Sequence, residues 1–313
     1  MQFSTKVPIS KYKNPITYES RIMLIGSCFT NNIGEKLEYF KFQNSVNPFG
    51  IIFNPVSIEK ILNRVINKIK FKENDIFFHN EQWHCFEVHS ELSNSNKDEF
   101  LKILNNLLID CRVKISKLTH FIITYGTSWV YRNLTSNEIV ANCHKVPQKE
   151  FTKELLSIEI ISKSIENTVL LIRKINPDCN FIFTISPVRH IKDGFIENQV
   201  SKSHLISAVY SSYLLPTTYF ASYEIMMDEL RDYRFYANDM LHPSQLAIDY
   251  IWIKFFENYV AESQFETMNV VCGIQKSLKH KPFNPESQKH LAFLADLNLK
   301  IDKIRTKYPF MEF

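Results

Sequence analysis

Residues 21–30 have the sequence RIMLIGSCFT, and this stretch indicates how the chain folds. Its first half is a short apolar run that ends at Gly26, a pattern typical of a strand buried in a parallel sheet. A helix is expected directly afterwards, because apolar residues recur every three to four positions from Ile33 to Phe40. A buried strand, a tight turn and a helix in this order predict the first unit of an α/β fold.

The same alternation of strands and helices continues along the chain. Later apolar runs predict strands at residues 120–124, 181–185 and 218–220. Periodic apolar positions predict helices at residues 56–71, 97–113, 158–175, 197–214 and 244–260. Strands that alternate with helices of this length imply right-handed crossovers and a mainly parallel sheet covered on both faces. The sequence therefore predicts a three-layer α/β/α domain.

Two additions to this domain are expected. Residues 75–90 contain two aromatic-rich runs on either side of the polar pair Asn80-Glu81, which predicts an inserted β-hairpin beside the main sheet. Near the C-terminus the alternation weakens, and residues 287–308 favour a peripheral helix. We therefore expect a main domain at residues 1–261 and a C-terminal helical extension at residues 262–313.

Composition and charge exclude several classes of function. The net charge of +4 is mild and no dense block of Lys and Arg is present, so no nucleic-acid partner is expected. Only six glycines occur, without a close cluster, which disfavours a Gly-rich phosphate-binding loop. The first residues form no apolar leader, and no apolar run reaches the length of about 18 residues that a membrane span needs. Six scattered cysteines favour reduced thiols, and we expect a cytoplasmic protein without a membrane partner.

Polar residues gather where the predicted strands end. Ligands of open parallel sheets bind outside the carboxyl ends of the strands. The sequence places three polar turns there, at residues 26–30, 125–129 and 186–190, and a fourth polar segment at residues 238–243 before the last helix of the domain. These four segments are expected to converge on one crevice.

Ser27 and Cys28 are the candidates for a nucleophile. Either side chain would lie at the N-terminus of the first helix, where free N–H groups and the helix dipole favour negative charge. Such a position lowers the pKa of a thiol and supplies part of an oxyanion hole. The alternative is structural, with Ser27 as a turn or cap residue and Cys28 as a small buried hydrophobic residue.

Asp239 and His242 are the candidates for an acid–base pair. They lie three residues apart in a predicted turn, so Asp239 would orient the imidazole and fix its tautomer while the other ring nitrogen faces the nucleophile. The alternative is that Asp239 caps the coming helix and His242 packs beside Pro243. Combined with a nucleophile after the first strand, the pair predicts a hydrolase-type active site.

Several side chains at the same strand ends are candidates for substrate binding. His144, Arg189 and His190 suit an anionic or hydroxylated substrate, because an Arg fork matches carboxylate or phosphate geometry. Tyr125 and Trp129 are either core residues or a platform for a sugar ring.

A metal site is the rival hypothesis for the histidines. No two of them stand four residues apart on a helix and no carboxylates cluster with them, so neither a metal nor another cofactor is expected. The histidines considered are His84, His89, His144, His190 and His242.

The sequence resembles the GSCFA-domain family over roughly residues 20 to 255. The motif Ile-Gly-Ser-Cys-Phe-Thr at residues 25–30 carries the resemblance. It continues through the motifs at residues 47–50, 125–129, 142–147, 186–190 and 233–236. That family in turn resembles the SGNH/GDSL hydrolases, which are α/β/α, flavodoxin-like esterases and acyltransferases with a nucleophile after the first strand and a final Asp-x-x-His block.

The resemblance implies roles for individual residues. Asp239 to His242 match the final block, and alignment on Gly26 places Cys28 on the usual nucleophilic Ser. Alignment by chemistry alone selects Ser27, but we favour Cys28 because a one-residue slip along a strand turns the side chain away. The oxyanion hole is then expected from Cys28, Gly50 and Ser128, the last standing in place of the usual Asn. Asn47 and Thr127, which lie in the shared motifs, join the expected substrate-binding residues.

Two functions follow from these residues. The first is an acyl-transfer enzyme, an esterase or O-acyltransferase, with a small-molecule or carbohydrate ester as its substrate; an acylated carbohydrate is expected by analogy with the wider superfamily. The second is a non-catalytic carbohydrate- or metabolite-binding module on the same fold, which Ser128 in place of Asn suggests.

Overall fold

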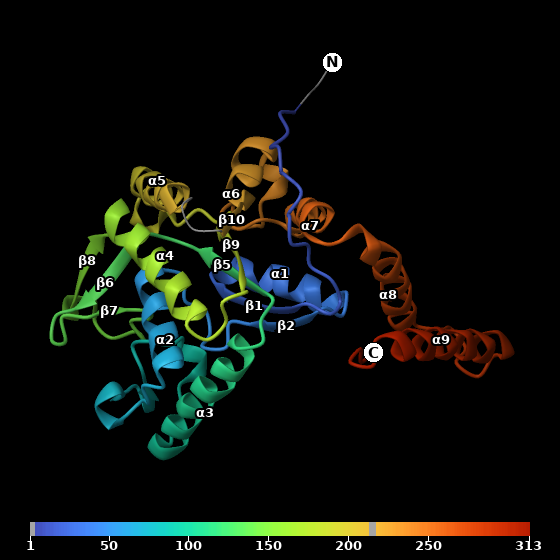
Figure 1. Ribbon diagram of the computed structural model, residues 1–313, viewed down its shortest axis with the longest axis horizontal. Helices are drawn as coiled ribbons and strands as arrows, with labels where there is room; N and C mark the ends of the chain where they lie inside the picture. The colour runs from blue at the N-terminus through green and yellow to red at the C-terminus, as the bar shows by residue number, and fades with distance from the viewer. Residues whose placement is uncertain (1–3, 213–216) are drawn as a thin grey trace.

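The computed structural model describes residues 4–212 and 217–313, and its centre is a sheet of five parallel strands (Figure 1). The strands run in the order β10-β9-β5-β1-β2, which is the flavodoxin-like order. Their bounds are β1 Arg21–Gly26, β2 Gln43–Val46, β5 His120–Tyr125, β9 Asn180–Ile185 and β10 Thr217–Phe220. The expected parallel α/β sheet is confirmed, and β2 is an edge strand that the sequence analysis did not predict.

Register places the carboxyl ends of the central strands side by side. Gly26 at the end of β1 pairs with Thr124 of β5, and Tyr125 at the end of β5 pairs with Ile185 of β9. The strand order reverses between β1 and β5, and crevices for ligands form at such a switch point. The loops after these strands therefore start next to one another at the position where a site is expected.

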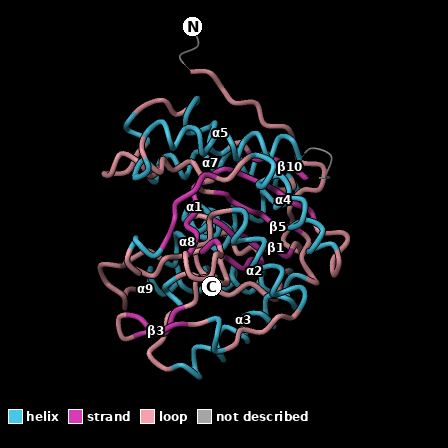
Figure 2. The backbone as a smooth tube through the Cα atoms, turned by 90° about the vertical axis from the view of Figure 1, so that its left-hand side faces the viewer, coloured by secondary structure: helices cyan, strands magenta, loops and turns pink. Residues whose placement is uncertain are grey.

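Helices cover both faces of the sheet, as Figure 2 shows for β1 and β5. Met23 and Ile25 of β1 pack against the helices of one face, while Ile22 and Leu24 pack against those of the other. The first face carries α2 Pro55–Asn67, α3 Lys97–Ile115, α4 Ile158–Arg173 and α5 Phe195–Ser211. The second carries α1 Cys28–Tyr39 and α7 Gln245–Tyr259, with the short α6 Ser222–Glu224 near β10. The three layers are confirmed; the predicted end of α5, at residues 213–214, lies outside the described residues.

Antiparallel strands are added beside the main sheet. The expected hairpin is present as β3 Phe77–His79 and β4 Gln82–His84, and it is shorter than predicted. Asn80 and Glu81 have φ values of 46° and 61°, as a tight hairpin turn requires. A three-stranded sheet was not predicted and consists of β6 Trp129–Asn133, β7 Ile139–Val140 and β8 Phe151–Leu155.

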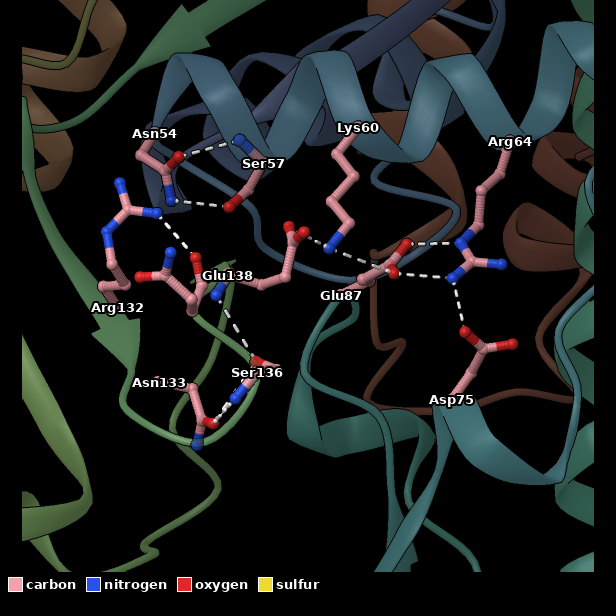
Figure 3. A network of polar contacts seen from close by, with 11 residues as sticks. Asn54, Ser57, Lys60, Arg64, Asp75, Glu87, Arg132, Asn133, Ser136 and Glu138 are labelled. Atoms are coloured by element: carbon pink, nitrogen blue, oxygen red, sulfur yellow. Dashed lines mark hydrogen bonds and ion pairs between the residues drawn. The ribbon is translucent and has the colours of Figure 1, made fainter.

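An ion-pair network joins α2 to the inserted segments (Figure 3). Arg64 donates to both carboxylate oxygens of Glu87 at 2.5 and 2.7 Å and to Asp75 at 2.7 Å. Lys60 lies 3.4 Å from Glu87 and 3.0 Å from Glu138 on the turn between β6 and β7. The Arg64 and Glu87 side chains are only 12% and 9% exposed, so their charges depend on each other for stabilisation.

We expect the Arg64→Met variant to lose about 3 kcal/mol of unfolding free energy, because it leaves the buried Glu87 carboxylate without its main partner. Urea unfolding followed by circular dichroism measures the loss. The control is Lys163→Met, which breaks an exposed pair with Glu166 and is expected to cost less than about 0.5 kcal/mol. An equal loss of unfolding free energy in the two variants would show that the network stabilises the fold no more than a surface ion pair does.

The C-terminal extension consists of two helices, α8 Phe265–Leu278 and α9 Gln288–Lys307. Helix α9 was predicted from the sequence, whereas α8 was not. Figure 1 shows the pair on the opposite side of the sheet from α2 to α4, next to α1 and β2. Tyr308 packs on Tyr18 with ring centroids 4.9 Å apart, and Met311 is buried in the same cluster as α1. Within the described ranges, no helix has the length and apolar character that crossing a membrane requires.

Candidate active site

The turn between β1 and α1 is built around Gly26. Its φ is +151°, and a Cβ atom there would lie 2.2 Å from the carbonyl oxygen of Thr124. Its N–H donates to Oδ1 of Asn47 at 2.8 Å. Only glycine fits this backbone without strain, so α1 can start directly after the strand and present its N-terminus at the switch point.

Ser27 and Cys28 take different places at this N-terminus. Ser27 is the N-cap residue, is 1% exposed, and its Oγ has no hydrogen-bond partner in the described parts of the chain. Cys28 is half-buried at the first position of α1, next to the free backbone N–H groups of Phe29 and of Cys28 itself. Burial raises the pKa of the Cys28 thiol, while these N–H groups and then Lys202 lower it and Asp239 raises it.

Asp239 and His242 form the expected pair. Nδ1 of His242 lies 2.6 Å from Oδ2 of Asp239, whose other oxygen accepts from the backbone N–H groups of His242 at 3.0 Å and Leu241 at 2.9 Å. These backbone bonds, followed by the bond to the His242 ring, lower the pKa of Asp239 to about 2. Because the helix α7 is capped by Ser244, Asp239 is not its cap. The carboxylate therefore holds the imidazole by one nitrogen, and among the described residues no partner occupies the other nitrogen, Nε2.

A cavity of about 390 Å³ lies beside this pair. Five of the residues singled out in the sequence line it: Thr127, Trp129, Arg189, His190 and His242. A hydrogen bond of 3.4 Å from the N–H of Arg189 to the carbonyl of Leu241 joins the loop after β9 to the Asp239 turn. The volume of the cavity falls within the range of pockets that hold small ligands.

Three expected substrate-binding residues lie away from the cavity wall. Tyr125 is fully buried and stacks on Phe183, so it is a core residue. Asn47 is held between the N–H of Gly26 and the side chain of Asn31, where it supports the turn after β1. His144 is buried beside the hairpin, and its Nε2 bonds to the carbonyl of Cys85.

Two expected oxyanion donors are engaged elsewhere in the fold. The N–H of Gly50 donates to the carbonyl of Asn47 at 2.8 Å, closing a turn. The N–H of Ser128 donates to Oγ of Ser201 at 2.8 Å, and its hydroxyl donates to the Ser201 carbonyl at 3.0 Å. Of the expected oxyanion donors, the backbone N–H of Cys28 remains at the start of α1, next to that of Phe29, and both N–H groups lower the pKa of the Cys28 thiol.

Several residues at the site were missed by the sequence analysis. Asn54, the N-cap of α2, and Cys143 line the cavity. Lys202 on α5 is fully buried behind the loops, and its Nζ donates to the carbonyls of Gly126 at 2.6 Å and Ser186 at 2.9 Å. It lies on the buried face of α5, three residues before Leu205, and this helical spacing is the sequence signal that could have shown its burial.

His190 is held neutral in the cavity wall. Burial, and then the charges of Lys202 and His242, lower its pKa to about 3. Its ring lies over Phe53 with centroids 6.2 Å apart. Across the ranges that the structure describes, no three His, Cys, Asp or Glu side chains form a group able to hold a metal ion.

Comparison with known proteins identifies the family. No curated protein sequence matches the chain significantly. Among solved structures, the fold is similar to an acetyl xylan esterase (Est2A) from the rumen bacterium Butyrivibrio proteoclasticus, with 9% identity and a TM-score of 0.38. That similarity covers 88% of this chain but only 66% of the esterase chain. Residues 21–255 match the GSCFA family and residues 271–313 match the C-terminal domain of GSCFA domain proteins. The chain therefore belongs to the GSCFA family.

Proposed function

We propose that this protein is an acyl-transfer enzyme, an esterase or O-acyltransferase, whose nucleophile is Cys28. The observation that carries the proposal is the Asp239–His242 pair, bonded at 2.6 Å with the imidazole on the cavity wall. The cysteine lies at the switch point of the sheet and is close enough to Asp239 for that charge to raise its pKa. A nucleophile, a base and the group that orients the base are the parts of a hydrolytic triad.

The proposed reaction uses these residues in two steps. Nε2 of His242 takes the thiol proton, and the sulfur of Cys28 bonds to the carbonyl carbon of the ester. The tetrahedral intermediate is stabilised by the N–H groups at the start of α1. When it collapses, the alcohol oxygen leaves with the proton from His242, and a thioester remains. Water or an acceptor hydroxyl then gives its proton to His242 and attacks the thioester, which returns the thiol and releases an acid or a new ester.

The choice of Cys28 over Ser27 is supported by burial. The Ser27 hydroxyl is enclosed at the N-cap and lacks a hydrogen-bond partner within the described residues, so no base activates it there. Cys28 is only half-buried, and the backbone N–H groups of Phe29 and Cys28 lower the pKa of its thiol against the effect of burial. Such donors favour the thiolate, which is the reactive form.

An acylated carbohydrate is the proposed substrate. The cavity wall combines the Trp129 ring with Arg189, whose Nε donates to the sulfur of Met227 at 3.4 Å. Aromatic rings bind the apolar face of sugars, and a guanidinium binds hydroxyl, carboxylate or acyl oxygens.

The test is to trap the acyl-enzyme. Incubation with p-nitrophenyl acetate, an acid quench and peptide mass mapping are expected to find an acetyl group on Cys28, together with turnover of the ester. A panel of acetylated sugars, aryl esters and thioesters then ranks substrates by kcat/KM. Wild-type protein that acylates at neither Cys28 nor Ser27 and turns over no member of the panel contradicts the proposal.

A non-catalytic binding module is the second candidate, because the N–H groups of Gly50 and Ser128 are both bonded within the fold. A binding module would bind acetylated sugars in calorimetry with an affinity that survives His242→Ala while hydrolysing none of them. Turnover that depends on His242 separates the two functions.

A further inference from the structure

Another cavity lies between α2 and α3, which pack beside each other on one face of the sheet (Figure 1). Its volume of about 420 Å³ is within the range of pockets that hold small ligands. Helix α2 starts at the candidate site, where Asn54 caps it, whereas this cavity is lined by Val65 and Lys68 at the end of the same helix. The 13 residues of α2 span about 20 Å, so the two cavities are separate. We call this one the α2–α3 groove.

Much of the lining of the α2–α3 groove is apolar. Val65 and Leu108 are buried there. Ile109 and Val113, one helical turn apart on α3, also line it, although they are 57% and 51% exposed. Large apolar side chains that lie next to each other on a helix surface and remain exposed are typical of a binding surface. The groove therefore favours a ligand with an apolar part.

The polar lining of the groove is positively charged. Lys68, Lys70 and Arg112 line it, and no carboxylate does so among the described residues. Neither lysine forms an ion pair within the described parts of the chain. Arg112 uses Nη1 to donate to the carbonyl of Ile66, which leaves other N–H groups of the guanidinium for a ligand. Three cations without an acidic partner in the lining favour an anionic head group.

The groove is fixed by hydrogen bonds on both sides of Lys68. The chain leaves α2 at this residue in the left-handed conformation, with φ of 57°. After the turn, the side chain of Asn105 on α3 accepts from the N–H of Phe71 at 2.9 Å and donates to its carbonyl at 3.1 Å. Before the turn, Arg112 of α3 holds the carbonyl of Ile66. The groove is therefore preformed, and little conformational entropy is lost when a ligand binds.

We propose that the α2–α3 groove binds a long-chain carboxylate, with its chain over Ile109 and Val113 and its head group against the three cations. The size of the groove favours this ligand over an acidic helix of another protein. A specific protein interface buries more than about 1,000 Å², whereas the volume of the groove is that of a small-ligand pocket. The proposal goes beyond the proposed acyl-transfer function and does not depend on it.

Calorimetric titration of the whole chain with laurate is expected to give a Kd of about 0.1 mM, as a ligand of this size can reach in an open groove. Acetate has the head group without the chain, and dodecyltrimethylammonium has the chain with a cationic head. Each should bind at least about tenfold more weakly than laurate. Equal affinity for laurate and the cationic amphiphile, or no binding of laurate, overturns the proposal.

Amide hydrogen exchange then locates the bound laurate. Residues 65–71 and 105–113, which contain the lining of the groove, should exchange more slowly when laurate is present. Slower exchange confined to the loops around the candidate site would place laurate in the other cavity and would also overturn the proposal.

Ile109→Gln tests the apolar part of the groove. The variant should bind laurate about tenfold more weakly, because a polar side chain of similar length replaces an apolar contact. The matched control is Ile160→Gln on α4, where the isoleucine is 50% exposed and lies outside the groove, and its affinity should equal that of the wild type. Since both positions are exposed, both variants should keep the wild-type circular dichroism spectrum. Equal affinities in the two variants contradict the proposal.

The double variant Lys68→Gln and Lys70→Gln tests the charge. It should bind laurate about tenfold more weakly, because two cations next to the head group are lost. The control removes two exposed lysines outside the groove, Lys102→Gln and Lys117→Gln, and should bind as the wild type does. Equal losses in the two double variants would show a general effect of net charge and overturn the proposal.

An acidic protein segment is the competing occupant of the groove. Binding of poly-glutamate that is lost in the Lys68 and Lys70 double variant, without any binding of laurate, would assign the groove to such a segment and reject the long-chain carboxylate. Failure of the proposed function leaves all of these measurements possible, because none of them depends on ester turnover.

Discussion

His242→Ala is expected to lower kcat for ester turnover by about a thousandfold or more. The variant removes the imidazole that Asp239 holds at Nδ1 and whose Nε2 has no hydrogen-bond partner among the described residues. Without it, no group takes the thiol proton or returns it to the leaving alcohol. Steady-state kinetics with p-nitrophenyl acetate measures the loss.

Asp239→Asn gives a sharper form of the same experiment. The remaining amide oxygen can still accept the backbone N–H groups of Leu241 and His242, so the turn should persist. The amide nitrogen, however, replaces the oxygen that lies 2.6 Å from Nδ1 of His242, and it must donate there. The proton then moves to Nε2, which can no longer accept one from Cys28, and kcat should fall by about a hundredfold or more.

The control for both variants is His280→Ala in the exposed segment after α8, which should leave kcat unchanged. If the wild-type enzyme is active and His242→Ala has the same kcat, the Asp239–His242 pair takes no part in the reaction.

Cys28→Ala is expected to reduce ester turnover by about ten-thousandfold or more, because the attacking atom is lost. Ser27→Ala is its matched control, one residue earlier in the same turn. The Ser27 hydroxyl is buried without a hydrogen-bond partner in the described ranges, so its removal should leave kcat within about threefold and should not lower the melting temperature. The measurement is kcat/KM for both variants, with thermal melts to confirm folding.

The reverse pattern, an inactive Ser27→Ala and an active Cys28→Ala, would move the nucleophile to the serine. Cys28→Ser adds a further comparison. An oxygen at the same position is a poorer nucleophile at neutral pH, so the variant should keep only a small part of the wild-type rate.

Much of the fold could be predicted because its central strands are continuous apolar runs. β1, β5 and β9 are buried on both faces, and this leaves a clear pattern. β2 was missed because an edge strand of sequence QNSV has no apolar run. The sheet of β6 to β8 was missed because short, half-exposed strands pair through contacts between segments distant in the sequence.

In the candidate site too, local contacts could be predicted from the sequence, and contacts between distant segments could not. The Asp239–His242 contact could be predicted because it is local, and Arg189 could be placed at the crevice because it follows a buried strand. The bonds of Ser128 could not be predicted, because its partner Ser201 lies on α5, far along the chain. The contacts of Lys202 could not be predicted for the same reason, since its two carbonyl partners are brought together only by the sheet.

Helix α1 begins at the candidate nucleophile and ends under the C-terminal extension. Nε2 of Gln275 on α8 donates to the carbonyl of Tyr39 at 3.0 Å, and α8 shares one apolar cluster with α1. A shortened chain that stops at residue 261 would expose the apolar surface on this side of α1 to solvent. Such a surface would promote aggregation during expression. For crystallisation, inhibitor screening or immobilisation, α8 and α9 should therefore be kept together with the α/β/α part of the chain.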